Sequence, residues 1–122
     1  MTWLAVAIGA GIGAPLRYLV EVYVHKSRAR VGAAGFPVAL LVVNVVGSTV
    51  AGVVATVSPI ARAGILIGFC GALTTYSGFG AHLDRQWRAN RRGFWITLVG
   101  MPVACIAAFV LALLLTRVVT GR

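Results

Sequence analysis

Acidic residues are almost missing from this chain. Among its 122 residues there are only two, Glu21 and Asp84, against 11 lysines and arginines. Histidine and cysteine are also scarce, with two of each. Enzymes that use acid–base or nucleophilic chemistry need paired carboxylates, or a nucleophile beside a base. No such set can be assembled from these residues, so we do not expect an enzyme.

Both cysteines, Cys70 and Cys105, fall inside apolar sequence. A cysteine in that setting behaves as a small hydrophobic residue, so we do not expect a disulfide between them. Neither cysteine has a histidine at the spacing of a metal-binding motif. The sequence therefore predicts no thiol-based metal site.

Apolar sequence, in contrast, is abundant. Hydrophobic residues make up 60% of the chain, and its mean hydropathy is +0.96. Four apolar stretches can be distinguished, at about residues 3–24, 36–57, 63–81 and 94–115, each near the ~20 residues that cross a bilayer. The first is too long and too interrupted by glycine for a signal peptide. We predict an all-α integral membrane protein, with residues 1–122 forming one domain of four transmembrane helices.

Basic residues gather at the ends of these stretches and give a formal net charge of +9. In a soluble chain this charge would suggest a nucleic-acid partner, but in a membrane protein it sets the orientation. Four spans place both termini and the second loop on one side, where there are three basic residues, Arg62, Arg117 and Arg122. The first and third loops hold seven, namely Lys26, Arg28, Arg30, Arg85, Arg88, Arg91 and Arg92. We therefore predict that these two loops are cytoplasmic, and we expect no nucleic-acid partner.

Residues 68–80, GFCGALTTYSGFG, interrupt the third apolar stretch with four glycines and a run of hydroxyl residues. Glycine costs a helix about 1 kcal/mol against alanine, and lipid offers no partner for a freed backbone group. Non-helical backbone at this depth is tolerated where it is buried in protein or lines a wet cavity. The glycines alone would suit close helix packing. The adjoining hydroxyl residues favour a broken helix with an ion site.

The first two stretches also contain small and polar residues. Gly9 and Gly13 share one helix face, which favours close approach by a neighbouring helix. Arg17 is spaced to pair with Glu21, and it is either a side chain reaching for the membrane surface or a vestibule charge that attracts anions. Asn44 needs a polar partner inside a membrane. It either bonds a neighbouring helix or faces a pore, and both roles remain open.

Three segments together resemble the CrcB/Fluc family of fluoride channels. They are residues 9–18 (GAGIGAPLRY), 43–48 (VNVVGS) and 68–79 (GFCGALTTYSGF). The resemblance implies an antiparallel dimer of four-helix subunits with a broken third helix. It also implies two fluoride pores flanked by aromatic rings, and a central structural sodium ion. The family positions map onto Gly71 and Thr74 for the backbone carbonyls that hold sodium, and onto Asn44, Tyr76 and Phe79 for the pore. We also assign Ser48 and Ser77 to the pore and Arg17 to the vestibule.

Some positions depart from the family pattern. Tyr76 replaces a phenylalanine, Gly78 stands where threonine is usual, and Leu40 follows Ala39 where the family favours Gly-Thr. If Thr97 takes the place of the family's tyrosine, Met101 falls where a serine is expected. These changes predict that one of the two pores is altered or closed. Together with the charge bias, they favour a homologous partner of opposite topology over a homodimer.

The predicted function is passive export of fluoride across the bacterial plasma membrane. The alternative is a small multidrug-resistance exporter, which is also a four-span antiparallel dimer but is coupled to protons. That mechanism needs a carboxylate in the middle of the first span, whereas Glu21 lies near its end and beside Arg17. A structural membrane subunit without its own transport is a third possibility, which the polar break in the third stretch disfavours.

Overall fold

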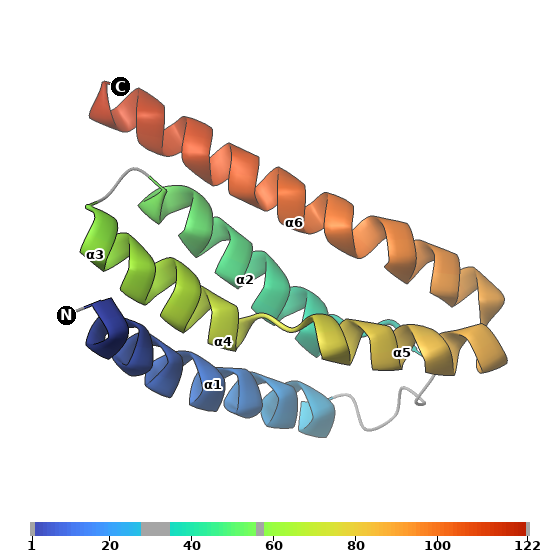
Figure 1. The fold of residues 1–122 in the computed structure, drawn as a ribbon. Coiled ribbons are helices and arrows are strands. Elements are labelled where there is room, and N and C mark those ends of the chain that lie inside the picture. Colours follow the sequence, from blue (N-terminus) through green and yellow to red (C-terminus); the bar gives the residue numbers. More distant parts are fainter. Residues whose placement is uncertain (1, 28–34, 56–57, 122) are drawn as a thin grey trace.

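The described parts of the four apolar stretches are mostly helical, and the four spans lie side by side in alternating directions (Figure 1). The computed structural model describes residues 2–27, 35–55 and 58–121. No strand occurs in these segments. The helices are α1 (Thr2–Ser27), α2 (Val38–Val54), α3 (Pro59–Arg62), η1 (Ala63–Cys70), α4 (Gly71–Leu73), α5 (Tyr76–Ala89) and α6 (Arg91–Thr120).

Three of the described helical segments are long and apolar enough to cross a membrane. They are Thr2–Val24 with 23 residues, Pro59–Ala89 with 31 and Arg91–Thr120 with 30. Helix α2 is equally apolar but has 17 residues, at the short end of the range that spans a bilayer. Part of the predicted second stretch, residues 56–57, lies outside the described segments, as do Arg28, Arg30 and Arg122.

Glycines on α1 and α2 allow two close helix contacts. A Cβ atom on Gly9 would overlap the carbonyl oxygen of Gly64 in η1, and one on Gly13 would overlap that of Phe69. On the other side of the bundle, a Cβ on Gly52 of α2 would overlap the carbonyl oxygen of Phe109 in α6. The shared face predicted for Gly9 and Gly13 is confirmed, and it is the surface on which α1 meets the third span.

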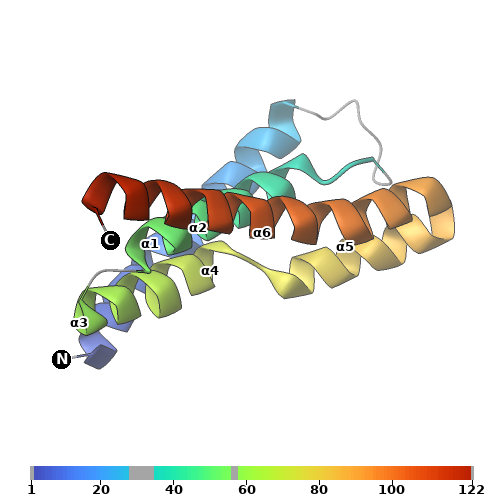
Figure 2. The same cartoon turned by 90° about the horizontal axis from the view of Figure 1, so that it is seen from above.

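The third span consists of two helical rods. Helices α3, η1 and α4 follow one another without interruption, and η1 is a stretch of π-helix, a wider form that often occurs near functional sites. The chain then leaves helical geometry and resumes it in α5, as the two views show (Figures 1 and 2). Helix α5 continues to Ala89, beyond the end expected near residue 81, so the sequence HLDRQ is helical rather than a connector.

Both ends of the chain lie at the end of the bundle that also contains the turn from α2 to α3 (Figure 1). The turn from α5 to α6 lies at the opposite end. Few side chains are fully buried, among them Val43, Leu73 and Met101, whereas large apolar residues on α1 and α6 are exposed. Such surfaces suit contact with lipid or with a partner subunit.

Candidate functional site

The third span loses its helical backbone at two threonines. Thr74 has φ −79° and ψ 158°, and Thr75 has φ −147° and ψ 124°, so both residues are extended. The Thr75 hydroxyl then starts α5, because its oxygen accepts a hydrogen bond from the N–H of Gly78 at 3.1 Å. This is an N-cap, which satisfies an amide that a helix start leaves unpaired. The break predicted within residues 68–80 is therefore present, at its centre.

The break redirects two backbone amides. In a continuous helix, the Thr75 N–H would donate to the carbonyl of Gly71, and the Gly78 N–H to that of Thr74. Instead, the Thr75 N–H donates to Asn44 Oδ1 at 3.0 Å, and the Gly78 N–H donates to the Thr75 hydroxyl. The carbonyls of Gly71 and Thr74 are thereby released from these two helical bonds. They belong to the residues that the family resemblance links to sodium.

Asn44 on α2 is the side chain that holds the break. Since its Oδ1 accepts from the Thr75 N–H, its Nδ2 points the other way and lies 3.7 Å from the Met101 sulfur. A thioether is a weak acceptor, so the Asn44 N–H groups remain available to a stronger one. The sequence left two roles open for Asn44, a hydrogen bond to a neighbouring helix and a place in a pore. The two are compatible, because the bond to Thr75 uses the side-chain oxygen of Asn44 and leaves its N–H groups.

The two aromatic candidates lie at the start of α5. The ring centroids of Tyr76 and Phe79 are 6.1 Å apart with planes tilted by 46°. Tyr76 is 85% exposed and Phe79 is half-buried. The Ser77 hydroxyl lies 3.2 Å from the Thr75 hydroxyl, and Ser48 lies half-buried one turn beyond Asn44. The fold thus groups these residues around the break, while their role in a pore remains a prediction.

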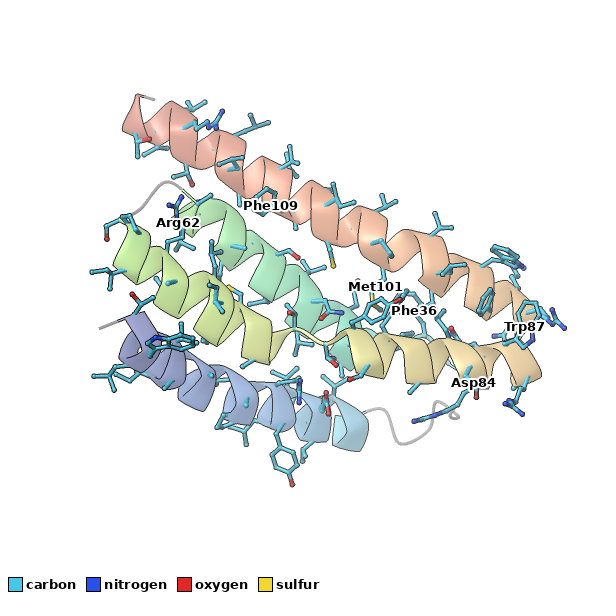
Figure 3. All side chains as sticks on the ribbon, in the orientation of Figure 1. Phe36, Arg62, Asp84, Trp87, Met101 and Phe109 are labelled. Carbon is cyan, nitrogen blue, oxygen red and sulfur yellow. The ribbon has the colours of Figure 1, made fainter. Side chains whose placement is uncertain are left out.

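Two of the positions that depart from the family pattern, Leu40 and Met101, carry buried apolar side chains, and Met101 faces the donor side of Asn44. Met101 is 2% exposed and Leu40 is 8% exposed (Figure 3 shows Met101 facing the centre of the bundle). A Cβ on Gly78 would lie 3.3 Å from a methyl group of Leu40. Leu40 therefore occupies space that a side chain at position 78 would need. Two of the departures noted in the sequence, Leu40 and Gly78, are thus neighbours in the structure.

Arg17 lies one turn beyond Gly13 on the same face of α1. At Gly13 that face approaches Ala72 and Leu73, immediately before the break. Arg17 is half-buried, and its Nε is 3.8 Å from Glu21 Oε1, so the pairing predicted by their spacing is confirmed. The ion pair is partly exposed and hence of small energetic value. Glu21 faces Arg17 and not an apolar surface, which gives no support to a proton-coupled carboxylate.

One polar cluster was not expected from the sequence. His82 Nε2 lies 2.9 Å from the carbonyl oxygen of Gly35, and Gln86 Nε2 donates to the same oxygen at 3.5 Å. Gln86 and Thr97 are fully buried, and Gln86 Oε1 and Thr97 Oγ1 have no hydrogen-bond partner among the described residues. The helical spacing of His82 and Gln86 on α5 was the available signal, because it places both on one face.

Comparison with known proteins identifies the family. The profile described as "CrcB-like protein, Camphor Resistance (CrcB)" matches residues 4–118. The chain belongs to the CrcB-like family. Members named "Fluoride-specific ion channel FluC" include one from Saccharophagus degradans, 38% identical over 126 residues, covering 94% of this chain and 89% of its own. A protein named "Fluoride-specific ion channel FluC 2" from Rhodococcus jostii is 43% identical over 110 residues, covering 88% and 89%.

A third CrcB-like relative, from Paramagnetospirillum magneticum, is 30% identical over 122 residues, covers 88% of this chain and 89% of its own, and is also named "Fluoride-specific ion channel FluC". The relatives span nearly the whole chain, so the match is not confined to the glycine motifs. With its apolar helices, the chain is a multi-pass protein of the bacterial inner membrane. The family resemblance noted in the sequence is confirmed.

Proposed function

We propose that this chain is a subunit of a fluoride-specific channel that exports fluoride passively and has no enzymatic activity. The observation that supports this most strongly is the helix break held by Asn44, in a chain whose relatives are named fluoride-specific channels. Fluoride is small and strongly hydrated, so a narrow pore must replace its water with hydrogen-bond donors. Among the described residues, the Asn44 side-chain N–H groups have the Met101 sulfur as their one hydrogen-bond partner, which leaves them available to a stronger acceptor.

The aromatic rings supply a second kind of contact. The edge of an aromatic ring has partial positive charge, and Tyr76 and Phe79 stand one turn apart at the same break. We propose that their edges follow the Asn44 donors along the fluoride path, with the hydroxyls of Ser48 and Ser77 beside them. Arg17, on the face of α1 that approaches the break, raises the local concentration of anions.

We further propose that a sodium ion binds at the break as a structural element. Sodium prefers hard oxygen ligands, and unwound backbone in membrane helices provides them. The residues present fit this requirement, because the amides that would engage the carbonyls of Gly71 and Thr74 are bonded elsewhere. Gly71 is also exposed on the surface of this chain. Its carbonyl can therefore face a second subunit, and the two breaks together would supply the ligands.

The partner that we propose is a homologous subunit inserted in the opposite direction. A homodimer with antiparallel subunits needs one sequence to insert both ways, and the excess of basic residues on loops one and three opposes this. We propose that such a pair has one conducting pore on the side where Tyr76 and Phe79 lie. We propose that the other pore is altered or closed by the apolar side chains of Leu40 and Met101, both of which are buried.

The test is fluoride efflux from proteoliposomes, measured with a fluoride electrode. The chain is reconstituted alone and with a homologous subunit of opposite charge bias, and a potassium ionophore balances the charge that leaves. Fluoride should be released without a proton gradient, and chloride should be retained. Strict proton coupling or preferred chloride release would overturn the proposal. Equal flux from the chain alone would retain the channel but remove the heterodimer.

A further inference from the structure

The turn from α5 to α6 presents an unusual concentration of arginine and tryptophan. We call residues 84–95, DRQWRANRRGFW, the α5–α6 corner. Within it, four arginines and two tryptophans are exposed, namely Arg85, Arg88, Arg91, Arg92, Trp87 and Trp95. A single carboxylate is present, Asp84, and it is bonded to Arg88 at 3.1 Å. The corner therefore has a strong excess of positive charge at one end of an otherwise apolar bundle (Figure 3).

The aromatic residues of the corner form a packed series. The rings of Trp87 and Phe94 pack edge to face with their centroids 5.0 Å apart, and the rings of Phe94 and Trp95 do so with their centroids 5.3 Å apart. The guanidinium of Arg91 lies 3.5 Å above the Trp87 ring, a contact in which the ring face attracts the cation. Trp87 is 41% exposed and Trp95 is 58% exposed. The indoles are thus held in place yet remain accessible.

The backbone of the corner is also fixed. Asn90 ends α5 and starts α6: its N–H donates to the carbonyl of Gln86 at 2.7 Å, and its side-chain oxygen accepts from the N–H of Gly93 at 2.9 Å. One residue thus joins the two helices with both ends capped. The arginines on either side are consequently presented from rigid helix ends, which reduces the entropy lost when they bind a ligand.

We propose that the α5–α6 corner binds the headgroup phosphate of an anionic phospholipid, chiefly through Arg85, Arg88 and Arg92. Guanidinium groups match the geometry of phosphate and can bind it with two parallel hydrogen bonds. Tryptophan prefers the boundary between headgroups and acyl chains, so Trp87 and Trp95 place these arginines at the depth of lipid phosphates. A soluble anion would use the arginines but would gain nothing from the exposed indoles.

The opposite end of the bundle lacks this combination. Trp3 lies there, 87% exposed, and Arg117 near the end of α6 (Figure 1). Arg62, at that same end, donates to the carbonyl of Ala55 at 3.4 Å, close to the end of α2. The chain therefore contains its own control, since it has tryptophans at both ends and a dense arginine cluster at one.

The experiment uses the three tryptophans of the chain as reporters. Trp3→Phe leaves the two indoles of the corner, and Trp87→Phe/Trp95→Phe leaves the indole of the other end. Each variant is reconstituted in phosphatidylcholine vesicles that contain a small fraction of brominated phosphatidylglycerol or, in parallel, of brominated phosphatidylcholine. Bromine quenches nearby tryptophans, so the ratio of quenching by the two lipids reports which lipid is enriched.

At the corner, we expect brominated phosphatidylglycerol to be enriched by at least about five-fold, the effect of one engaged arginine near a membrane surface. Trp3 should show a ratio near one. In the Trp3→Phe background, Arg85→Gln/Arg88→Gln/Arg92→Gln should abolish the preference. The same three positions changed to Lys should retain only part of it, because an ammonium attracts phosphate but cannot form two parallel hydrogen bonds. Arg117→Gln is the matched control and should leave the preference unchanged.

Equal quenching by the two lipids at the corner would overturn the proposal, as would a preference that survives the triple glutamine variant. Soluble glycerol phosphate is added in a final arm. If it removes the preference at concentrations that leave the vesicle charge unscreened, the site takes free phosphate esters and the lipid assignment is wrong. Persistence of the preference under these conditions supports a lipid bound at the interface.

Discussion

At the scale of single residues, one amide side chain has a structural role, and we propose that it also binds the permeating anion. Asn44 reaches from α2 to the break in the third span, and its oxygen replaces a helical carbonyl as partner of the Thr75 N–H. Without it, that N–H would be left unpaired within the protein, at a cost of about 1–3 kcal/mol. In the described part of the chain, its nitrogen has one hydrogen-bond partner, the Met101 sulfur. Structural support and anion recognition can therefore be separated by mutation.

Asn44→Asp preserves the acceptor for Thr75 but places a negative charge where an anion would pass. We expect the subunit to assemble and the fluoride flux to fall by about tenfold or more, because like charges a few ångströms apart in a poorly solvated site repel by more than 1 kcal/mol. Asn44→Leu removes the acceptor and should lower thermal stability as well. Efflux and melting temperature are measured for both; unchanged flux in Asn44→Asp would place the residue outside the path.

Gly71 tests the proposed sodium ion. A Cβ added there would meet the Leu66 carbonyl oxygen at an ordinary 3.7 Å, so Gly71→Val fits within the subunit. A loss of dimer or of fluoride flux would then reflect the crowded dimer axis, where the cation is expected. Gly100→Val is the control, since that position is also open in the described structure. If Gly71→Val remains fully active, the break binds no cation on the axis.

Leu40 and Gly78 should behave as a coupled pair. Gly78→Thr alone places its Cβ 3.3 Å from Leu40 and 3.0 Å from a methyl group of Thr75, so we expect destabilisation of about 1–3 kcal/mol. Leu40→Thr in the same chain removes the contact with Leu40 but not that with Thr75, so it should recover part of that loss. A double-mutant cycle by thermal unfolding measures the coupling. Additive effects would show that the two positions do not share space.

At the scale of helices, the contact of α1 with the third span depends on missing side chains. Gly9→Ala forces a methyl group against the backbone of Gly64, so we expect a loss of about 1–3 kcal/mol. Gly11→Ala, on the same helix, meets no described atom within 4 Å and should be neutral or stabilise by up to ~1 kcal/mol through helix propensity. Equal effects on the unfolding temperature would refute the close contact.

The sequence predicted the break in the third span because its residues break local rules. Four glycines and a run of hydroxyl residues inside apolar sequence would destabilise a continuous membrane helix. The exact place of the break was not predictable, because it depends on Asn44, which is 31 residues away from Thr75 in the chain. The bond from His82 to Gly35 was missed for the same reason, since it links residues 47 apart.

Packing faces were easier to predict than polar roles. Gly9 and Gly13 share a face by helical geometry alone, and so do Arg17 and Glu21. The length of α5 was underestimated because its second half, HLDRQWRA, is polar enough to end an apolar stretch. Its polar residues have local reasons to remain helical, including the Asp84–Arg88 pair one turn apart.

At the scale of the whole molecule, the charge bias predicts a single orientation in the membrane. In a background with Cys70→Ala and Cys105→Ala, we expect Thr2→Cys to react with a membrane-impermeant maleimide in intact cells and Ala89→Cys to remain protected. Both positions are exposed in the fold and lie at opposite ends of the bundle. Equal labelling of both sites would mean dual insertion, and the heterodimer proposal would have to be dropped.

The broken span also divides the molecule mechanically. Its first rod, from α3 to α4, packs along α1, while its second rod, α5, packs with α6 and is joined to it through Asn90 alone. A change of angle at Thr74 and Thr75 would move α5 without breaking the hydrogen-bond ladder of either rod, whereas α6 also packs along α2. Asn44 on α2 holds this junction, because its side-chain oxygen accepts the hydrogen bond from the Thr75 N–H. The non-helical backbone of the span thus lies in two residues, and one side chain from another helix accepts a hydrogen bond from it.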